Sequence, residues 1–258
     1  MIAELPMYVA PAEVLQASEH WLNQTLRGLG ISQRQRDDEP LEQLWLNPRL
    51  LLSQTCGYPL VTRLKDQVRV VGRPCFDLPD AQGGQHCSLL VVHRLAPWQA
   101  LAELQGSHGV INSEDSNSGM NLLRHALAPL ARQGRFFSRV SVSGSHRESL
   151  RRVAAGQADL AAIDSVTFAY LKRFAPDTVA QVRVLGRTAP SPTLPYITSH
   201  HGIPVDQLRD ALNISLTANP EVAQTLGIVS VVPARLQDYR VLQDYEAQAV
   251  QLGFGRLD

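Results

Sequence analysis

Residues 139–174 read RVSVSGSHRESLRRVAAGQADLAAIDSVTFAYLKRF, and their hydrophobic period changes along the stretch. Alternating residues 139–142 predict a strand, and the apolar positions of 145–155 have helical spacing. The apolar run 158–163 predicts a second strand, and 165–174 predicts a second helix. Strands that alternate with amphipathic helices are typical of an α/β fold with a largely parallel sheet.

The same alternation begins further upstream. A strand over 109–112 and a helix over 119–132 complete a βαβαβα block. This block is flanked by the β-branched run 88–94 and by segment 185–196, which carries three of the chain's prolines. We expect the chain to cross between two lobes in these two segments.

The crossings define a domain organisation. Lobe 1 is predicted to be discontinuous and lobe 2 to be inserted into it, with boundaries 1–90 plus 193–258 for lobe 1 and 91–192 for lobe 2. Each lobe is expected to hold a mixed, mostly parallel sheet flanked by helices, with a ligand cleft between the lobes. The other predicted elements are a helix between Pro11 and Gly30, strands 50–53 and 67–71, and helices 205–216, 220–226 and 234–251.

Composition excludes several classes of protein. Over 258 residues, 24 Lys+Arg balance 24 Asp+Glu, and no basic run gathers, so nucleic-acid binding is not expected. Cys56, Cys75 and Cys87 fit no zinc or redox spacing, and we predict neither a metal site nor a cofactor. Three buried thiols are favoured, and one disulfide among the three cysteines stays open as the alternative. No stretch reaches the ~20 apolar residues of a membrane span.

Small polar residues follow all three strands of the block. Ser116, Ser118 and Gly119 precede the helix 119–132, where hydroxyls and backbone amides gather at the positive end of the helix and a glycine allows close approach. These residues could hold an anion, or they could form an ordinary N-cap.

The second and third strands end in similar groups. Ser145 and Glu148 fit a capping box, and the neighbouring His146 could donate an imidazole N–H to an anion or lie at the surface. Asp164 could cap the next helix, meet a cationic or hydrogen-bond-donating part of a ligand, or do both. Because strand ends of one parallel sheet share an edge, these three junctions are expected to line one wall of the ligand site.

The opposite wall is expected from lobe 1. Thr55 and Tyr58 follow strand 50–53, and Tyr8 follows the N-terminal strand. Aromatic and hydroxyl groups at strand ends suit a small polar ligand, although either tyrosine could also be a packing residue.

Three of these runs resemble one family. LLSQTCGYPL at 51–60, DSNSGMN at 115–121 and GSHRESLRRVAAGQADLAAID at 144–164 resemble the PhnD-like phosphate/phosphonate-binding proteins of bacterial ABC importers. The resemblance covers essentially the whole chain and implies a type II periplasmic-binding-protein fold with two α/β lobes that close on an oxyanion. It also implies that Ser116, Ser118 and His146 bind the anionic group.

The remaining site roles also come from the resemblance. It implies that Tyr8, Thr55 and Tyr58 face the anion from lobe 1 and that Asp164 meets the other end of the ligand. Aminophosphonate binders of the family carry a second acidic residue after the second crossing strand, where residues 189–193 of this chain offer only hydroxyls.

The predicted function is a monomeric, non-catalytic receptor that delivers a phosphonate, phosphate or related phosphorylated compound to an ABC permease. Two alternatives stay open: a cytoplasmic sensing or regulatory protein of the same fold, and a Ser/His-dependent hydrolase. Against the hydrolase, the sequence has no G-x-S-x-G elbow. The N-terminal residues lack the features of a signal peptide, so we expect a periplasmic location if one was removed and a cytoplasmic location otherwise.

Overall fold

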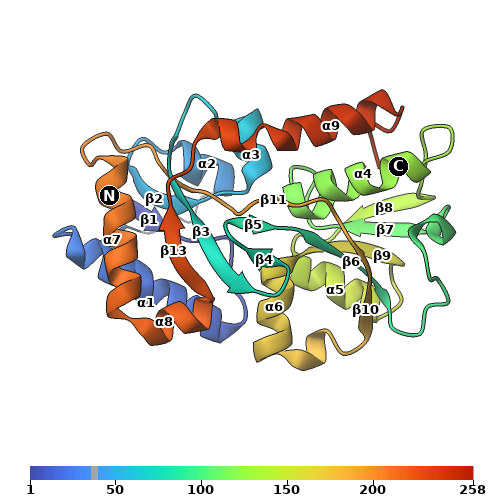
Figure 1. The fold of residues 1–258 in the computed structure, drawn as a ribbon, viewed down its shortest axis with the longest axis horizontal. Coiled ribbons are helices and arrows are strands. Elements are labelled where there is room, and N and C mark those ends of the chain that lie inside the picture. The colour runs from blue at the N-terminus through green and yellow to red at the C-terminus, as the bar shows by residue number, and fades with distance from the viewer. Residues whose placement is uncertain (36–39, 258) are drawn as a thin grey trace. The chain divides into compact units, whose positions relative to one another are not determined.

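Two β-sheets, each covered by helices, organise the chain in the computed structural model, which describes residues 1–35 and 40–257 (Figure 1). The chain divides into two compact units. Unit 1 comprises Met1–Gln85 and Pro192–Tyr239, and unit 2 comprises His86–Ser191 and Arg240–Asp258. The fold class is therefore α/β with two sheets, as the sequence predicts.

Unit 1 is built on strands from both ends of the sequence. Its elements are β1 (Ile2–Glu4), α1 (Ala12–Gly28), α2 (Leu41–Leu46), β2 (Leu50–Gln54), α3 (Gly57–Thr62), β3 (Arg69–Leu78), β4 (Ala81–Gln82), β12 (Tyr196–Thr198), α7 (Val205–Ala218), α8 (Pro220–Leu226), β13 (Ile228–Val232) and the 3-10 helix η5 (Leu236–Tyr239). The strand order is β1-β2-β12-β3-β4, and β13 also pairs with β3. Helix α1 packs against α7 and α8.

A buried tryptophan joins the helices of unit 1 to the sheet. Trp21 of α1 is 1% exposed, and its indole Nε1 donates to the Leu212 carbonyl of α7 over 3.0 Å. The Trp21 ring also meets Tyr196 of β12 edge to face, with 5.6 Å between ring centroids. The helical spacing of apolar residues between Pro11 and Gly30 therefore produces the core-facing side of α1, as predicted.

Unit 2 contains the βαβαβα block. Its elements are β6 (Ser88–His93), η1 (Leu101–Leu104), β7 (His108–Ile111), the π-helical turn η2 (Asn117–Asn121), α4 (Leu122–Leu127), η3 (Ala128–Leu130), β8 (Arg139–Val142), α5 (His146–Ala154), β9 (Leu160–Asp164), α6 (Ser165–Phe174), η4 (Pro176–Thr178), β10 (Val182–Arg187) and α9 (Val241–Gln251). The strand order is β10-β6-β9-β7-β8. The short strands β5 (Gln85–His86) and β11 (Ser191–Pro192) pair where the chain passes between the units.

The crossovers of unit 2 put helices on both faces of its sheet. The connection from β7 to β8 moves one way across the sheet, and the connection from β8 to β9 moves back. Right-handed crossovers in opposite directions place α4 and α5 on opposite faces, as Figure 1 shows. Leu150 and Val153 of α5 pack with Val91, Val110 and Ile163 of the sheet in one hydrophobic core.

Strand direction differs from the expected mostly parallel pairing. Parallel pairs are β1 with β2, β7 with β8 and β7 with β9, while β6 pairs antiparallel with both β9 and β10, and β12 pairs antiparallel with both β2 and β3. The reason is topological. The strands next to the points where the chain changes unit run against the βαβ strands, and hydrophobic period does not report direction.

Several predicted boundaries also change. The first crossing falls at 85/86, just before the expected segment 88–94, because β6 lies within unit 2, and the second falls at 191/192, inside the expected segment 185–196. A third crossing at 239/240 places residues 240–258 in unit 2, whereas the sequence reading put them in lobe 1; α9 packs there against α4. The helix expected at 119–132 begins instead at Asn117 with the π-turn.

Candidate functional site

The three polar junctions of unit 2 follow β7, β8 and β9. Because β7 pairs in parallel with both β8 and β9, the carboxyl ends of all three strands lie at one edge of the sheet. The structure therefore brings together two predicted site residues from different junctions: Ser118 Oγ and His146 Nε2 lie 2.8 Å apart, within hydrogen-bond distance.

The first junction is a tightly packed helix start. Ser116 caps η2, since its Oγ accepts the Gly119 amide over 3.0 Å, and Ser116 and Ser118 are 6% and 5% exposed. A Cβ atom added to Gly119 would lie 1.7 Å from Asn112 Oδ1 and 3.2 Å from His146 Cε1. Glycine is needed here for space, because it lets the imidazole and the Asn112 amide approach the backbone.

A second hydroxyl supports this helix start from β6. Ser88 is fully buried, and its Oγ donates to the Ser118 carbonyl over 2.8 Å. The Ser118 backbone is therefore fixed by the sheet, which leaves its side chain oriented toward His146. A hydroxyl and an imidazole held together at the start of a helix are suited to donate to an oxyanion.

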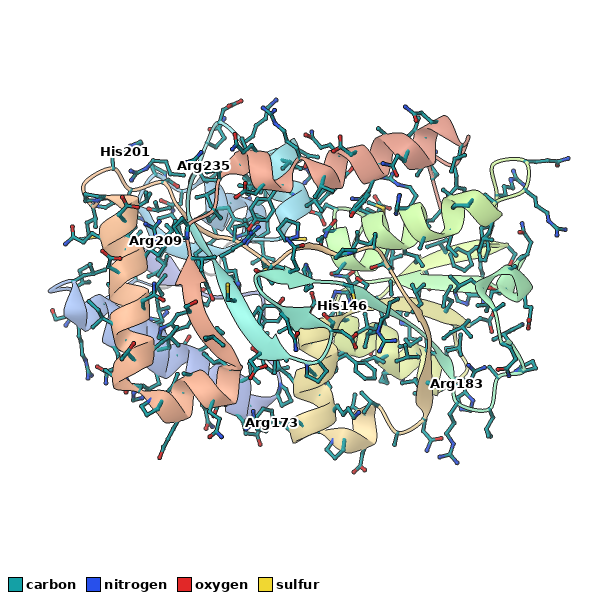
Figure 2. The ribbon with its side chains drawn as sticks, viewed as in Figure 1. His146, Arg173, Arg183, His201, Arg209 and Arg235 are labelled. Carbon is teal, nitrogen blue, oxygen red and sulfur yellow. The ribbon has the colours of Figure 1, made fainter. Side chains whose placement is uncertain are left out.

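His146, labelled in Figure 2, is the first residue of α5 and is half-buried. Burial of the ring lowers the pKa of His146 below its usual range, and the Asp164 carboxylate opposes this shift. Its Nδ1 is buried and has no hydrogen-bond partner among the described residues. The lowered pKa favours a neutral imidazole at pH 7.

Ser145 lies at the surface of the protein. Its Oγ accepts the Glu148 amide over 3.1 Å, as the capping box predicts. The Glu148 carboxylate instead accepts from Arg151 and Arg152, and these hydrogen bonds lower the pKa of Glu148 to about 2. Ser145 therefore acts as a cap that fixes the start of α5, and with it the position of the next residue, His146.

Asp164 is both a cap and one member of a buried ion pair. Its Oδ1 accepts the Thr167 amide over 2.9 Å, so it caps α6. Its Oδ2 lies 2.8 Å from His86 Nδ1, and the two side chains are 3% and 1% exposed. Burial alone would raise the pKa of Asp164, but the His86 and His146 imidazoles together with the Thr167 amide hold it below its usual range.

His86 is the residue that sequence reasoning missed. It lies two residues before the predicted strand 88–94, in no recognisable motif. Its contact with Asp164 follows from the antiparallel register of β6 and β9, in which Ser88 pairs with Asp164. Only the run of apolar residues after His86 hints that its side chain is buried, and nothing in the spacing indicates the register.

The predicted residues of lobe 1 lie in unit 1. Thr55 follows β2 and is fully buried, Tyr58 is a buried residue of α3, and Tyr8 follows β1 and meets Phe76 edge to face with 6.3 Å between ring centroids. Because β1 and β2 are parallel neighbours, the segments that carry Tyr8 and Thr55 leave the same edge of the unit 1 sheet. That these three residues face the ligand stays a prediction.

Among residues 1–35 and 40–257, no group of three or more His, Cys, Asp or Glu side chains is arranged to hold a metal ion. No helix in the described part of the chain is long and apolar enough to span a bilayer. Cys56, Cys75 and Cys87 are thiols.

Comparison with solved structures shows the fold. The binding-protein component of an ABC phosphonate transporter from Pseudomonas aeruginosa is 13% identical, with a TM-score of 0.78 over 97% of this chain and 87% of that chain. PhnD1 from Prochlorococcus marinus, solved with methylphosphonate, is 14% identical, with a TM-score of 0.75 over 97% and 98%. XAC2383 from Xanthomonas citri, solved with ATP, is 16% identical, with a TM-score of 0.67 over 97% and 98%.

Comparison with sequences gives the family. No curated protein matches significantly. The family model described as "ABC transporter, phosphonate, periplasmic substrate-binding protein" matches residues 52–239, which include the ends of β2, β7, β8 and β9 and the Ser118–His146 pair. This is a family of substrate-binding transport proteins rather than enzymes, and its members are periplasmic. The chain thus belongs to the periplasmic phosphonate-binding protein family of ABC transporters.

Proposed function

We propose that this protein is the substrate-binding component of an ABC importer and that it captures a small oxyanion, either a phosphonate or a related phosphorylated compound. The observation that carries the proposal is the 2.8 Å contact between Ser118 Oγ and His146 Nε2 at the start of η2. Ser116 and Gly119 complete the proposed anion site, because the Ser116 hydroxyl caps the Gly119 amide and the missing Gly119 side chain leaves room beside His146.

The chemistry of this group suits a tetrahedral anion. Hydroxyls, backbone amides and an imidazole donate hydrogen bonds in several directions, and a hydrogen bond to a charged group contributes about 1.5–3 kcal/mol. An anion held in this way needs no lysine or arginine, and it can leave again when the protein meets its permease.

Capture is proposed to involve closure of the two units, with Tyr8, Thr55 and Tyr58 of unit 1 completing the ligand shell. The chain changes unit three times, at 85/86, 191/192 and 239/240, and such connections are where a hinge would bend. Small-angle scattering with and without saturating methylphosphonate tests this part. We expect the radius of gyration to fall; an unchanged value, with bound ligand verified by calorimetry, would contradict closure.

A thermal-shift screen followed by calorimetric titration tests the binding function. The panel contains methylphosphonate, ethylphosphonate, phosphate, sulfate and ATP. A true ligand at 100 times its Kd should add about 2.7 kcal/mol to the free energy of unfolding. If no phosphonate or phosphorylated compound stabilises the protein, the proposal fails.

A Ser/His-dependent hydrolase is a second candidate, because the Ser118–His146 contact is also the geometry of a nucleophile and its base. A receptor and a hydrolase differ in turnover. We expect no product from p-nitrophenyl phosphate, p-nitrophenyl acetate or the bound phosphonate after prolonged incubation. Turnover that disappears in Ser118→Ala would instead favour the enzyme.

A further inference from the structure

The buried pair of His86 and Asp164 is not explained by the helix cap alone. Asp164 caps α6 with Oδ1, and Oδ2 is the atom that lies 2.8 Å from His86 Nδ1. Desolvating a carboxylate and its polar partner is costly, and apolar side chains of similar volume are often at least as stabilising as a buried pair. A role in ligand recognition would account for keeping the pair in the protein.

A continuous series of contacts joins this pair to the proposed anion site. Asp164 lies opposite Ser88 in the antiparallel register of β9 and β6. The Ser88 hydroxyl donates to the Ser118 carbonyl, and the Ser118 hydroxyl contacts His146. The electrostatic effect of Asp164 on the pKa of His146 also shows that the carboxylate acts on the anion-binding imidazole.

The second ring nitrogen of His86 is available for a ligand. Both ring nitrogens are buried, and neither makes an aligned hydrogen bond to a described residue, although Nδ1 lies 2.8 Å from Asp164 Oδ2 and buried polar atoms are nearly always paired. The whole residue is 2% exposed. Because Nδ1 lies against Asp164, Nε2 is the ring nitrogen left to hydrogen-bond a bound molecule.

Charge then decides which molecule fits. A lone carboxylate near a bound oxyanion repels it, unless a positive group lies between or beside them. In this protein the His86 ring occupies Asp164 Oδ2 from within the protein, with 2.8 Å between Nδ1 and Oδ2. A ligand that carried its own ammonium group would have to compete with this ring for Asp164, and it would lose hydration in doing so.

We infer, resting on the oxyanion-binding function proposed above, that His86 is a specificity-determining residue: its ring occupies Asp164 Oδ2 from the protein side, so the site takes phosphonates with an uncharged organic substituent and rejects those that carry an ammonium group.

The test uses two ligands that differ by one ammonium group, ethylphosphonate and 2-aminoethylphosphonate, titrated calorimetrically at pH 7. Wild-type protein should bind ethylphosphonate at least tenfold more tightly than 2-aminoethylphosphonate. In His86→Gln the side chain keeps a similar length without a charge, so Asp164 becomes available to the ammonium group. The affinity ratio should move toward 2-aminoethylphosphonate by at least tenfold.

The double variant His86→Gln/Asp164→Asn is the matched control. Asparagine keeps the α6 cap, and removal of both partners leaves no unpaired buried charge. Its affinity ratio should return toward that of the wild type, because the gain for the ammonium compound requires the Asp164 carboxylate. A residue with only a structural role would change stability in these variants but not the ratio.

The outcomes separate the two proposals. If wild-type protein binds neither compound, the phosphonate-binding function itself fails. If it binds ethylphosphonate but the ratio is the same in His86→Gln, or if the wild type prefers 2-aminoethylphosphonate, the assignment of His86 is wrong while the binding function stands. If His86→Gln does not unfold cooperatively, His86→Asn takes its place, and the wild-type ratio alone can still refute the inference.

Discussion

Replacing Ser118 by alanine should weaken oxyanion binding much more than it weakens the fold. The substitution removes the 2.8 Å contact with His146 Nε2 in a side chain that is 5% exposed. His146 Nδ1 already lacks a partner among the described residues, so both ring nitrogens would then depend on water or ligand. A buried polar group without a partner costs about 1–3 kcal/mol.

These magnitudes predict two separate readouts. At about 2–4 °C per kcal/mol for a chain of this size class, the melting temperature of Ser118→Ala should fall by about 2–12 °C. If the hydroxyl also donates to a charged oxygen, the loss of about 1.5–3 kcal/mol weakens binding by about 10- to 150-fold. Calorimetric titration with methylphosphonate at 25 °C measures the affinity, and scanning calorimetry measures the stability.

The control is Ser138→Ala, which removes an exposed hydroxyl that donates to the Ser107 carbonyl in the same unit. This variant should match the wild type in affinity and stay within about 0.5 kcal/mol in stability. The reasoning would be refuted by a Ser118→Ala variant that melts at a lower temperature yet binds methylphosphonate within twofold of the wild type.

Three further predictions concern the same group of residues. Ser145→Ala should lower the free energy of unfolding by about 1 kcal/mol through loss of the α5 cap, with an affinity loss well below that of Ser118→Ala; equal losses would make Ser145 a direct ligand contact. Gly119→Ala should weaken methylphosphonate binding at least tenfold, because the added methyl group would displace Asn112 and press on His146. The control is Gly28→Ala, which should leave the affinity unchanged because nothing lies within 4 Å of the added atom. The free energy of unfolding should fall as the pH drops below about 6.5, because His146 with a lowered pKa stays neutral in the folded protein while the unfolded chain takes up a proton. His146→Gln should flatten that part of a scanning-calorimetry series between pH 5 and 8, and an identical pH dependence in this variant would contradict the assignment.

Local signals in the sequence were sufficient for the elements of the βαβαβα block. The structure confirms β8 at Arg139–Val142 and α6 at Ser165–Phe174, because strand alternation and the caps at Ser145 and Asp164 act over only a few residues. In contrast, β13 lies within a stretch between two predicted helices where no strand was predicted, and it exists because β3 offers an antiparallel edge. Its stability depends on a partner about 150 residues away, which period and propensity do not report.

The candidate site divides in the same way. Ser116, Ser118, His146 and Asp164 all follow predicted strands, so the sequence could place them at strand ends. The choice of partners could not be predicted, since the Ser118–His146 contact depends on packing between η2 and α5. The contact between His86 and Asp164 depends on the register between β6 and β9. A slip of one residue in that register would abolish the contact.

The assignment of α9 to unit 2 has a consequence for the order in which the parts of the proposed anion site become available. Helix α9 supplies the Leu242 carbonyl to Asn121 Nδ2 over 2.9 Å, at the end of the π-turn that begins the proposed anion site. Residues 86–191 leave the ribosome earlier than α9, and unit 1 residues 192–239 are made in between. The C-terminal helix is therefore the last support of the proposed anion site to be synthesised, and a chain that ended before α9 would lack the Leu242 carbonyl that holds Asn121.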